Sequence, residues 1–535
     1  MPRRLPACLW ALLSAAVAAG QTPSDLGRID FRTSGSASAQ EHFLRGALLL
    51  HSFEYEDAAD EFRQAQKQEP GFAMAYWGEA MTYNHPLWMD RDADAARQAL
   101  GRLAPSREAR RARAPTERER LYLDAVEELY ADGQKADRDR AYAESMGRLA
   151  EAFPADLDAK SFYALALLGT CEGVRDIPTY IKAAAIVEEV FAKNPEHPGA
   201  SHYLIHAYDD PVHAPLGMRA ARVYARIAPA ATHALHMPSH IFLASGMWDE
   251  VVASNEASWK ASLDRAERQK LGPDAHSYHA LSWLAYGYLQ QGRYREARHA
   301  LALAEEDTAK SGSARARTHL VTMRAAYLVE TGRWKGEAAK IRISSDDLSS
   351  KNLDLFVLGV AALENGDRGE AQRIRERMSA AGSDSGGGHS HGGAAVPSGW
   401  AGTDEVLRRL LDAKLLFATG ERNQAIALAK EAAAAADGMS YEFGPPDIVK
   451  PPHELAGEML LAAGRPADAR TEFEASLRGA PGRAQSLLGL ARAAAAAGDR
   501  EPSARAYARL RENWKRADED VAGLSEARRA SPAGS

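Results

Sequence analysis

Residues 39–72 read AQEHFLRGALLLHSFEYEDAADEFRQAQKQEPGF, and the order of small, aromatic and proline residues in this stretch predicts two packed helices. Small residues allow two antiparallel helices to approach closely, an aromatic residue fills the gap between units, and a proline stops the second helix. The residues that take these places are Gly46, Ala58, Phe62, Ala65 and Pro70. The stretch therefore predicts a helical hairpin.

The same spacing recurs along the chain at a period of about 34 residues. Close copies occupy residues 450–483, with Gly457, Gly464, Ala469, Phe473 and Pro481, and residues 278–311, with Gly292, Tyr294, Ala297 and Ala304. Weaker copies run through 318–351, 352–380, 406–439 and 484–517. In this spacing the chain resembles the tetratricopeptide repeat (TPR) family. The resemblance implies an all-α superhelix, or solenoid, built from helical hairpins.

Changes in composition along the chain divide it into six segments. We expect a signal peptide at 1–20, a linker at 21–38, a repeat array at 39–380, a flexible Gly-rich loop at 381–399, a second array at 400–517 and a disordered tail at 518–535. The loop reads AGSDSGGGHSHGGAAVPSG, a composition typical of a mobile connection. We expect this loop to separate the two arrays.

The first twenty residues, MPRRLPACLWALLSAAVAAG, place two arginines before a short apolar run that ends in small residues. This pattern is typical of a secretory signal and is too short for a stable membrane span. We expect an exported protein, periplasmic or secreted, with no membrane span in the mature chain. Cys171 is then the one remaining cysteine, so no disulfide within the chain and no thiolate metal cluster is expected.

The charge balance argues against a nucleic-acid partner. The chain carries 66 Lys and Arg against 73 Asp and Glu, a formal net charge of −7, and shows no basic stripe. Nucleic-acid-binding domains normally present clustered positive charge.

Histidines concentrate in one part of the chain. Residues 232–240 read THALHMPSH, so that His233, His236 and His240 share one face of a helix, and His202 and His206 form another helical pair in SHYLIHAYDD. Pro238 interrupts the first helix: either the helix is kinked there, or it begins at Pro238 with His233 and His236 on a preceding turn.

The repeat resemblance places these histidines in the concave groove, which the first helix of each hairpin lines. A helical His-x-x-x-His pair can bring two nitrogens to one ion, so the predicted metal ligands are His202, His206, His236 and His240. Nearby or supporting candidates in the groove are His85, Asp209, Asp210, His233, His276 and His279. Without thiolates, the candidate ions are divalent zinc, copper, iron or nickel.

The function that follows is an exported TPR-like scaffold that binds a protein or peptide segment in its groove and holds a divalent metal ion there. The text of AYWGEAMTYNHPLW (75–88) and GPPDIVKPPHELAGEMLL (444–461) also resembles a group of exported bacterial TPR proteins. Two alternatives stay open: a metal-dependent enzyme, oxidative or hydrolytic, that uses the same histidines, and a metal-free peptide-binding scaffold.

Overall fold

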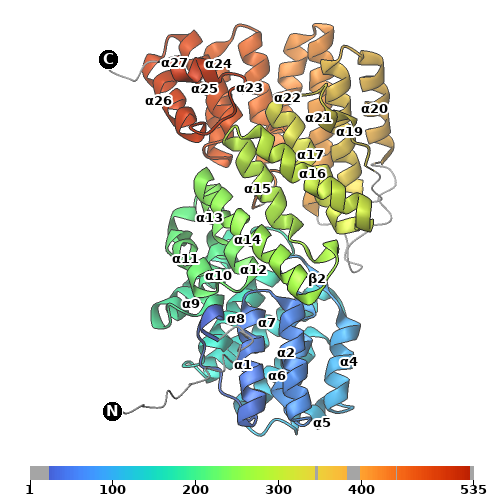
Figure 1. Cartoon of the computed structure of the whole chain (residues 1–535), viewed down its shortest axis with the longest axis vertical. Helices are drawn as coiled ribbons and strands as arrows, with labels where there is room; N and C mark the ends of the chain where they lie inside the picture. Colours follow the sequence, from blue (N-terminus) through green and yellow to red (C-terminus); the bar gives the residue numbers. More distant parts are fainter. Residues whose placement is uncertain (1–22, 344–347, 382–397, 442, 531–535) are drawn as a thin grey trace, which may run out of the picture.

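The computed structural model describes residues 23–343, 348–381, 398–441 and 443–530, and these are almost entirely helical (Figure 1). The strands of the described residues form one short antiparallel hairpin, β1 (Asn84–His85) paired with β2 (Asp90–Arg91). Within the same residues, no helix combines the length and the apolar character needed to cross a membrane. The all-α class predicted from the sequence is confirmed.

Short connections reverse the chain between consecutive helices, which pack on one another as hairpins. The elements of the first half are η1 (Pro23–Leu26), α1 (Ala37–His51), α2 (Tyr55–Gln68), α3 (Ala73–Met81), α4 (Ala93–Leu103), α5 (Arg107–Arg111), α6 (Glu117–Leu129), α7 (Lys135–Ala152), α8 (Leu157–Gly169), α9 (Ile177–Lys193), α10 (Pro198–Tyr208), α11 (Ala214–Ile227), α12 (Thr232–His236), α13 (Pro238–Ala244) and α14 (Trp248–Gln269).

The second half continues the same arrangement. Its elements are η2 (Pro273–Ala275), α15 (Tyr278–Gln290), α16 (Tyr294–Ser311), α17 (Ala314–Thr331), α18 (Glu337–Lys340), α19 (Leu348–Glu364), α20 (Arg368–Ala381), α21 (Ser398–Thr419), α22 (Arg422–Asp437), α23 (Pro452–Ala462), α24 (Pro466–Gly479), α25 (Ala484–Ala497), α26 (Arg500–Asn513) and α27 (Leu524–Arg529). In Figure 1, α1–α8 form one end of the molecule and α16–α27 the other.

A buried aromatic ring between two glycines explains the repeat. Phe62 on α2 lies between Gly46 on α1 and Gly78 on α3. A Cβ atom on Gly46 would lie 2.8 Å from the Phe62 ring, and one on Gly78 would lie closer still. Only glycine therefore admits the ring, which joins one hairpin to the next.

The same wedge recurs at the far end of the chain. Phe473 on α24 lies between Gly457 on α23 and Gly489 on α25, and a Cβ on Gly457 would lie 2.9 Å from its ring. The sequence spacing predicts that Phe62 and Phe473 fill the gaps between repeat units. In the structure, each ring lies against glycines of two neighbouring helices, as predicted. The described chain is a solenoid of TPR-type helical hairpins.

The second half of the chain curls back onto the middle of the molecule. The indole nitrogen of Trp248 donates to the carbonyl of Gly482 at 2.9 Å, and the backbone nitrogen of Asp518 donates to the carbonyl of Gly292 at 3.0 Å. Arg483 is fully buried and donates to the Tyr286 hydroxyl at 2.9 Å. These contacts fasten α24–α27 to α14 and α15.

Two of the expected segment boundaries need correction. The expected disordered tail begins at 518, yet residues 518–530 are ordered, with Leu524 and Ala527 of α27 buried against α26. These apolar side chains give the tail a face to bury, which the sequence analysis overlooked. The two arrays are also not separated, because α20 and α21 pack directly on one another.

The remaining segments lie partly outside the described residues. The signal peptide (1–20) and most of the Gly-rich loop, with His389 and His391, fall there. The linker at 21–38 is described from residue 23 and packs closely, with Phe31 buried against Phe43 and Trp77.

Candidate metal centre

Four short stretches of helix bring the predicted histidines together in the middle of the molecule. His202 and His206 lie on α10, His236 ends α12, His240 lies on α13, and His279 lies on α15. Pro238 is the first residue of α13, so the second of the two alternatives considered for this segment holds. Met237 keeps helical dihedral angles between α12 and α13, which keeps the rings of both helices on the same side.

The structure distributes the predicted ligands over two adjoining groups of three histidines rather than one group of four. The first triad is His202, His206 and His233, and the second triad is His236, His240 and His279. Within each triad, one nitrogen from every ring lies within 4.8 Å of the others. His233 and His279, expected only as supporting residues, are therefore as central as the predicted ligands.

The closest approaches join ring nitrogens directly. In the first triad, Nε2 of His202 lies 3.2 Å from Nε2 of His233, and in the second, Nε2 of His236 lies 3.1 Å from Nε2 of His240. Two imidazole nitrogens bound to one tetrahedral ion at 2.0–2.1 Å are separated by about 3.3 Å. The observed separations match that geometry.

Hydrogen bonds to the opposite nitrogens fix the tautomers of the rings. His236 Nδ1 donates to the side-chain oxygen of Asn255 at 2.6 Å, and the Asn255 amide orientation is set because its nitrogen donates to the Val251 carbonyl. His240 Nδ1 donates to Asp209 at 2.9 Å. Both Nε2 atoms are then lone-pair acceptors that face each other without a proton between them. A bound cation would remove that repulsion.

The first triad has the same construction. His202 Nδ1 donates to the backbone carbonyl of His51 at 2.7 Å, so its Nε2 also carries a lone pair. His206 Nε2 is buried and has no hydrogen-bond partner. Because an unpaired buried polar atom is costly, His206 Nε2 is available for a ligand that the protein itself does not provide.

Burial keeps the rings in the neutral form that binds metals. Desolvation lowers the pKa of His202, His233, His236 and His279 well below the usual value, and lowers that of His240 to about 4 despite its hydrogen bond to Asp209. Neutral imidazole is the ligand form, so protons compete weakly for these nitrogens at neutral pH.

Asp209 is a carboxylate that contacts ring nitrogens of the cluster. Its Oδ2 atom lies 2.9 Å from Nδ1 of His240 and 3.5 Å from Nδ1 of His206. Burial opposes its ionisation, but Arg175 and the two histidines outweigh that effect and hold the pKa of Asp209 below its usual range. A carboxylate behind a metal-binding histidine fixes the ring and raises its basicity.

The second predicted aspartate faces away from the histidines of both triads. Asp210 accepts from Arg175 at 3.2 Å and from Nδ1 of His213 at 2.8 Å, and also caps the backbone nitrogen of Val212. Its contribution is to hold Arg175, which in turn contacts Asp209.

Aromatic rings and a distant segment of the chain cover the cluster. Phe53 lies against all three rings of the first triad, and Trp283 stacks on His240 with centroids 4.5 Å apart. Phe443 packs on His240 at 5.0 Å. Phe443 belongs to the described residues 438–441 and 443–451, here called the strap, which lie between α22 and α23. The Ser440 hydroxyl of the strap accepts from the backbone nitrogen of Arg175 at 2.7 Å.

The strap changes the expectation of an open groove. The repeat resemblance predicts histidines on a surface free to take a peptide, whereas His202, His206, His236 and His240 are each at most 4% exposed. The covering segment comes from more than 200 residues further along the chain, as Ser440 and Arg175 show. The spacing of residues within a repeat carries no information about such a contact.

Two further predicted candidates lie outside the triads. His85 on β1 has Nε2 at 3.1 Å from the Thr82 carbonyl and stacks on Tyr55. His276 binds Asp307 at 2.9 Å. Both rings are accounted for by protein partners.

A third buried cluster, absent from the sequence prediction, contains His51, Asp158 and His197. His51 Nε2 lies 3.0 Å from Asp158 and its Nδ1 lies 3.0 Å from the Tyr203 hydroxyl. His197 Nδ1 accepts from the backbone of Ala200 and caps α10. These hydrogen bonds use both nitrogens of His51, whose backbone carbonyl accepts from His202 Nδ1, whereas His197 Nε2 is buried without a hydrogen-bond partner.

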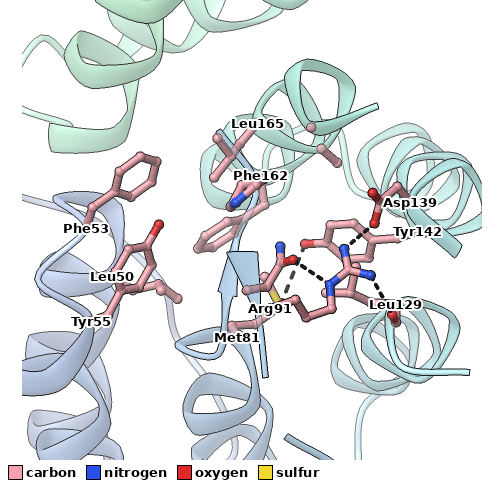
Figure 2. Close-up of a pocket in the computed structure, with 14 residues that line it drawn as sticks. Leu50, Phe53, Tyr55, Met81, Arg91, Leu129, Asp139, Tyr142, Phe162 and Leu165 are labelled. Carbon is pink, nitrogen blue, oxygen red and sulfur yellow. Dashed lines mark hydrogen bonds and ion pairs between the residues drawn. The ribbon is translucent and has the colours of Figure 1, made fainter. Parts of the chain in front are cut away.

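A small pocket lies beside Phe53 (Figure 2). Phe53, Leu50 and Tyr55 line one side, and Phe162 and Leu165 lie across from them. At the polar end, the Arg91 guanidinium pairs with Asp139 and donates to the Asn84 side chain at 2.9 Å. The pocket shares Phe53 with the histidine cluster.

Comparisons with known proteins add little beyond the fold. No protein-family model matches the chain, and no curated protein matches it. Similar solved structures include the APC/C hetero-tetramer Cut9–Hcn1 (13% identity, covering 86% of this chain and 78% of that chain, TM-score 0.36). Another is the human IFIT1 dimer with m7Gppp-AAAA (13% identity, covering 91% of this chain and 89% of that chain, TM-score 0.35). A third is the TPR domain of P58(IPK) (12% identity, covering 86% of this chain and 99% of that chain, TM-score 0.23). At such low identities and TM-scores, the fold assignment rests on the helix packing described above.

Proposed function

We propose that this chain is a TPR-like scaffold protein whose buried histidine cluster binds a divalent transition-metal ion. The observation that carries the proposal is the pair of Nε2 atoms on His236 and His240, 3.1 Å apart, both left as lone-pair acceptors by their Nδ1 partners. Asp209 behind His240 and Asn255 behind His236 supply the supporting hydrogen bonds that metal-binding imidazoles normally have.

The nature of the donors restricts the ion. Every donor in the two triads is an imidazole nitrogen, which suits zinc, copper, nickel and iron rather than calcium or magnesium.

The test is elemental analysis of the chain purified without an affinity tag, with His389 and His391 replaced by alanine to remove chelation by the Gly-rich loop. We expect a stoichiometric transition metal whose content falls when His236 and His240 are both replaced by alanine. The matched control is His276→Ala, which removes a histidine already paired with Asp307. An unchanged metal content in the double variant would contradict the proposal.

The second candidate function is a metal-dependent enzyme, oxidative or hydrolytic. The observation that favours it is the number of protein donors, because a triad of nitrogens leaves at least one coordination position of the ion open. Azide added to the cobalt-loaded protein should shift the visible absorption bands of the cobalt if that position is accessible. An unchanged spectrum would contradict an open catalytic site.

We also propose export and a protein partner. Export rests on the signal-like residues 1–20. Fusing these residues to a reporter that is active only outside the cytoplasm tests export, and an inactive fusion beside an active control would contradict export.

A protein partner is supported by the hairpin array itself, since stacked hairpins present extended surfaces. A peptide would enter the histidine groove only after the strap moves away.

A further inference from the structure

We infer that the histidine cluster binds two metal ions side by side, one in the first triad and one in the second. The inference rests on the proposed metal-binding function and specifies the number of ions and the ligands of each. Ligands of the first ion are His202, His206 and His233, and those of the second ion are His236, His240 and His279.

The six rings do not converge on one point. Within each triad, one nitrogen from every ring lies within 4.8 Å of the others. Two nitrogens on opposite sides of an ion, each 2.0–2.1 Å from it, are about 4.2 Å apart, so each triad fits a single ion. Among the described residues, no group of this size joins His202 or His233 to His236 or His279. A single ion would therefore leave three imidazoles without a metal.

Both triads leave nitrogens that protein groups do not satisfy. In the second triad, the facing Nε2 atoms of His236 and His240 have no proton to share. In the first triad, the buried Nε2 atom of His206 has no hydrogen-bond partner, whereas the Nε2 atom of His202 lies 3.2 Å from that of His233. An ion in one triad would not relieve the unsatisfied nitrogens in the other.

Asp209 and His206 connect the two triads. One carboxylate oxygen of Asp209 lies within 4.8 Å of a ring nitrogen of His206, in the first triad, and of a ring nitrogen of His240, in the second. The ring centroids of His206 and His240 are 5.3 Å apart, and those of His233 and His236 are 5.9 Å apart. These distances are close to those within each triad, for example 4.9 Å between His202 and His206 and 5.1 Å between His236 and His240. The two ions would be neighbours.

The experiment counts ions in the full chain, again with His389 and His391 replaced by alanine. The protein is stripped with a chelator, loaded with zinc, desalted and analysed for metal and protein content. We expect a zinc-to-protein ratio of two in this parent and in the control variant His276→Ala. The double variants His202→Ala/His233→Ala and His236→Ala/His279→Ala should each hold one zinc, with circular dichroism showing that each stays helical.

A second measurement needs no ligand variant. Loading with copper(II) to one and then two equivalents should produce magnetic coupling between neighbouring ions in the electron paramagnetic resonance spectrum only at the higher loading. A parent that holds one zinc, or two coppers that show no coupling, would overturn the two-ion inference while leaving the proposed function intact. A parent that holds no metal would overturn the proposed function itself.

Discussion

At the scale of single residues, hydrogen bonds at Nδ1 decide what the histidines can do. His202, His236 and His240 each donate from Nδ1 to an oxygen, on the His51 backbone, Asn255 and Asp209 respectively. The three rings therefore present Nε2 to the centre of the cluster. His51, by contrast, uses both nitrogens within the protein and serves as support.

The support from Asp209 leads to a prediction. Replacing Asp209 with asparagine should weaken zinc binding by about 10–100-fold, the usual effect of removing a partner behind a metal-binding histidine. The measurement is a competition titration against a chromophoric chelator. The control is Asp210→Asn, which alters the same arginine contact but touches no histidine of either triad. Equal affinities for the two variants would contradict the role given to Asp209.

An ion pair far from the cluster predicts a pH effect. A hydrogen bond to Glu472 raises the pKa of His453 above its usual value, with Asp437 adding to the shift. A histidine whose pKa is raised by folding stabilises the fold fully below about pH 6.5, and this contribution disappears as the pH rises through the higher folded value. Between pH 6 and 9, the free energy of unfolding of wild type should therefore fall relative to that of His453→Gln by less than about 1 kcal/mol, which melting curves at a series of pH values measure. A constant difference would contradict the ion pair's contribution.

Much of the candidate site follows from the sequence, and the part that does not has a physical reason. Helical spacing and the repeat phase identify His202, His206, His236 and His240 as neighbours. They do not divide the rings into triads, because that division depends on how α10, α12, α13 and α15 pack on one another, which helical spacing does not report. Phe443 and Ser440 are absent from the prediction because they reach the cluster from the strap.

At the scale of helices, the aromatic wedge determines how hairpins stack. Adding a methyl group by Gly78→Ala should destabilise the first hairpins by about 1–3 kcal/mol, because the Phe62 ring occupies the place of the new Cβ. The matched control is Gly101→Ala on α4, where no atom lies within 4 Å and the helix should gain about 0.5–1 kcal/mol. Melting curves of the two variants should shift in opposite directions. A shift in the same direction would contradict the wedge.

The strap has its own glycine constraint. Gly444 has φ +115°, a conformation that favours glycine, and a Cβ there would lie 2.7 Å from the Trp283 ring. Gly444→Ala should displace the strap and speed the removal of bound metal by a chelator several-fold. The control is Gly438→Ala, where the nearest atom is at 3.5 Å and φ is −82°. Identical chelation rates would show that the strap does not limit access to the cluster.

The helices themselves were the most predictable part of the fold. The 34-residue phase located Gly46 and Phe62, and equally Gly457 and Phe473, because each repeat needs the same close contact. The hairpin of β1 and β2 and the short helix α27 fall outside that phase. Their formation depends on contacts made elsewhere, such as the hydrogen bond from Asp518 to Gly292, which helical periodicity does not report.

At the scale of the whole molecule, the return of α24–α27 to α14 and α15 joins the two halves. Trp248 reaches Gly482, and Arg483 is buried among Tyr286, Glu330 and Glu454. Because the strap leads into α23, this closure also holds the cover over the histidines in place. Repeat arrays are often stabilised by neighbouring units alone, so contacts between distant units of this kind are not part of the sequence pattern.

The central claim is that the buried histidine cluster is a metal site. Its most direct test is the melting curve of the tag-free, chelator-stripped chain with and without zinc. In this chain, His389 and His391 are replaced by alanine. At zinc concentrations of 100–1,000 times the dissociation constant, binding should stabilise the fold by about 3–4 kcal/mol for each ion bound. The curve should rise in temperature accordingly, and His236→Ala/His240→Ala should reduce the rise. If zinc, copper, nickel and iron all leave the melting curve unchanged and the protein as purified contains no metal, the claim is wrong.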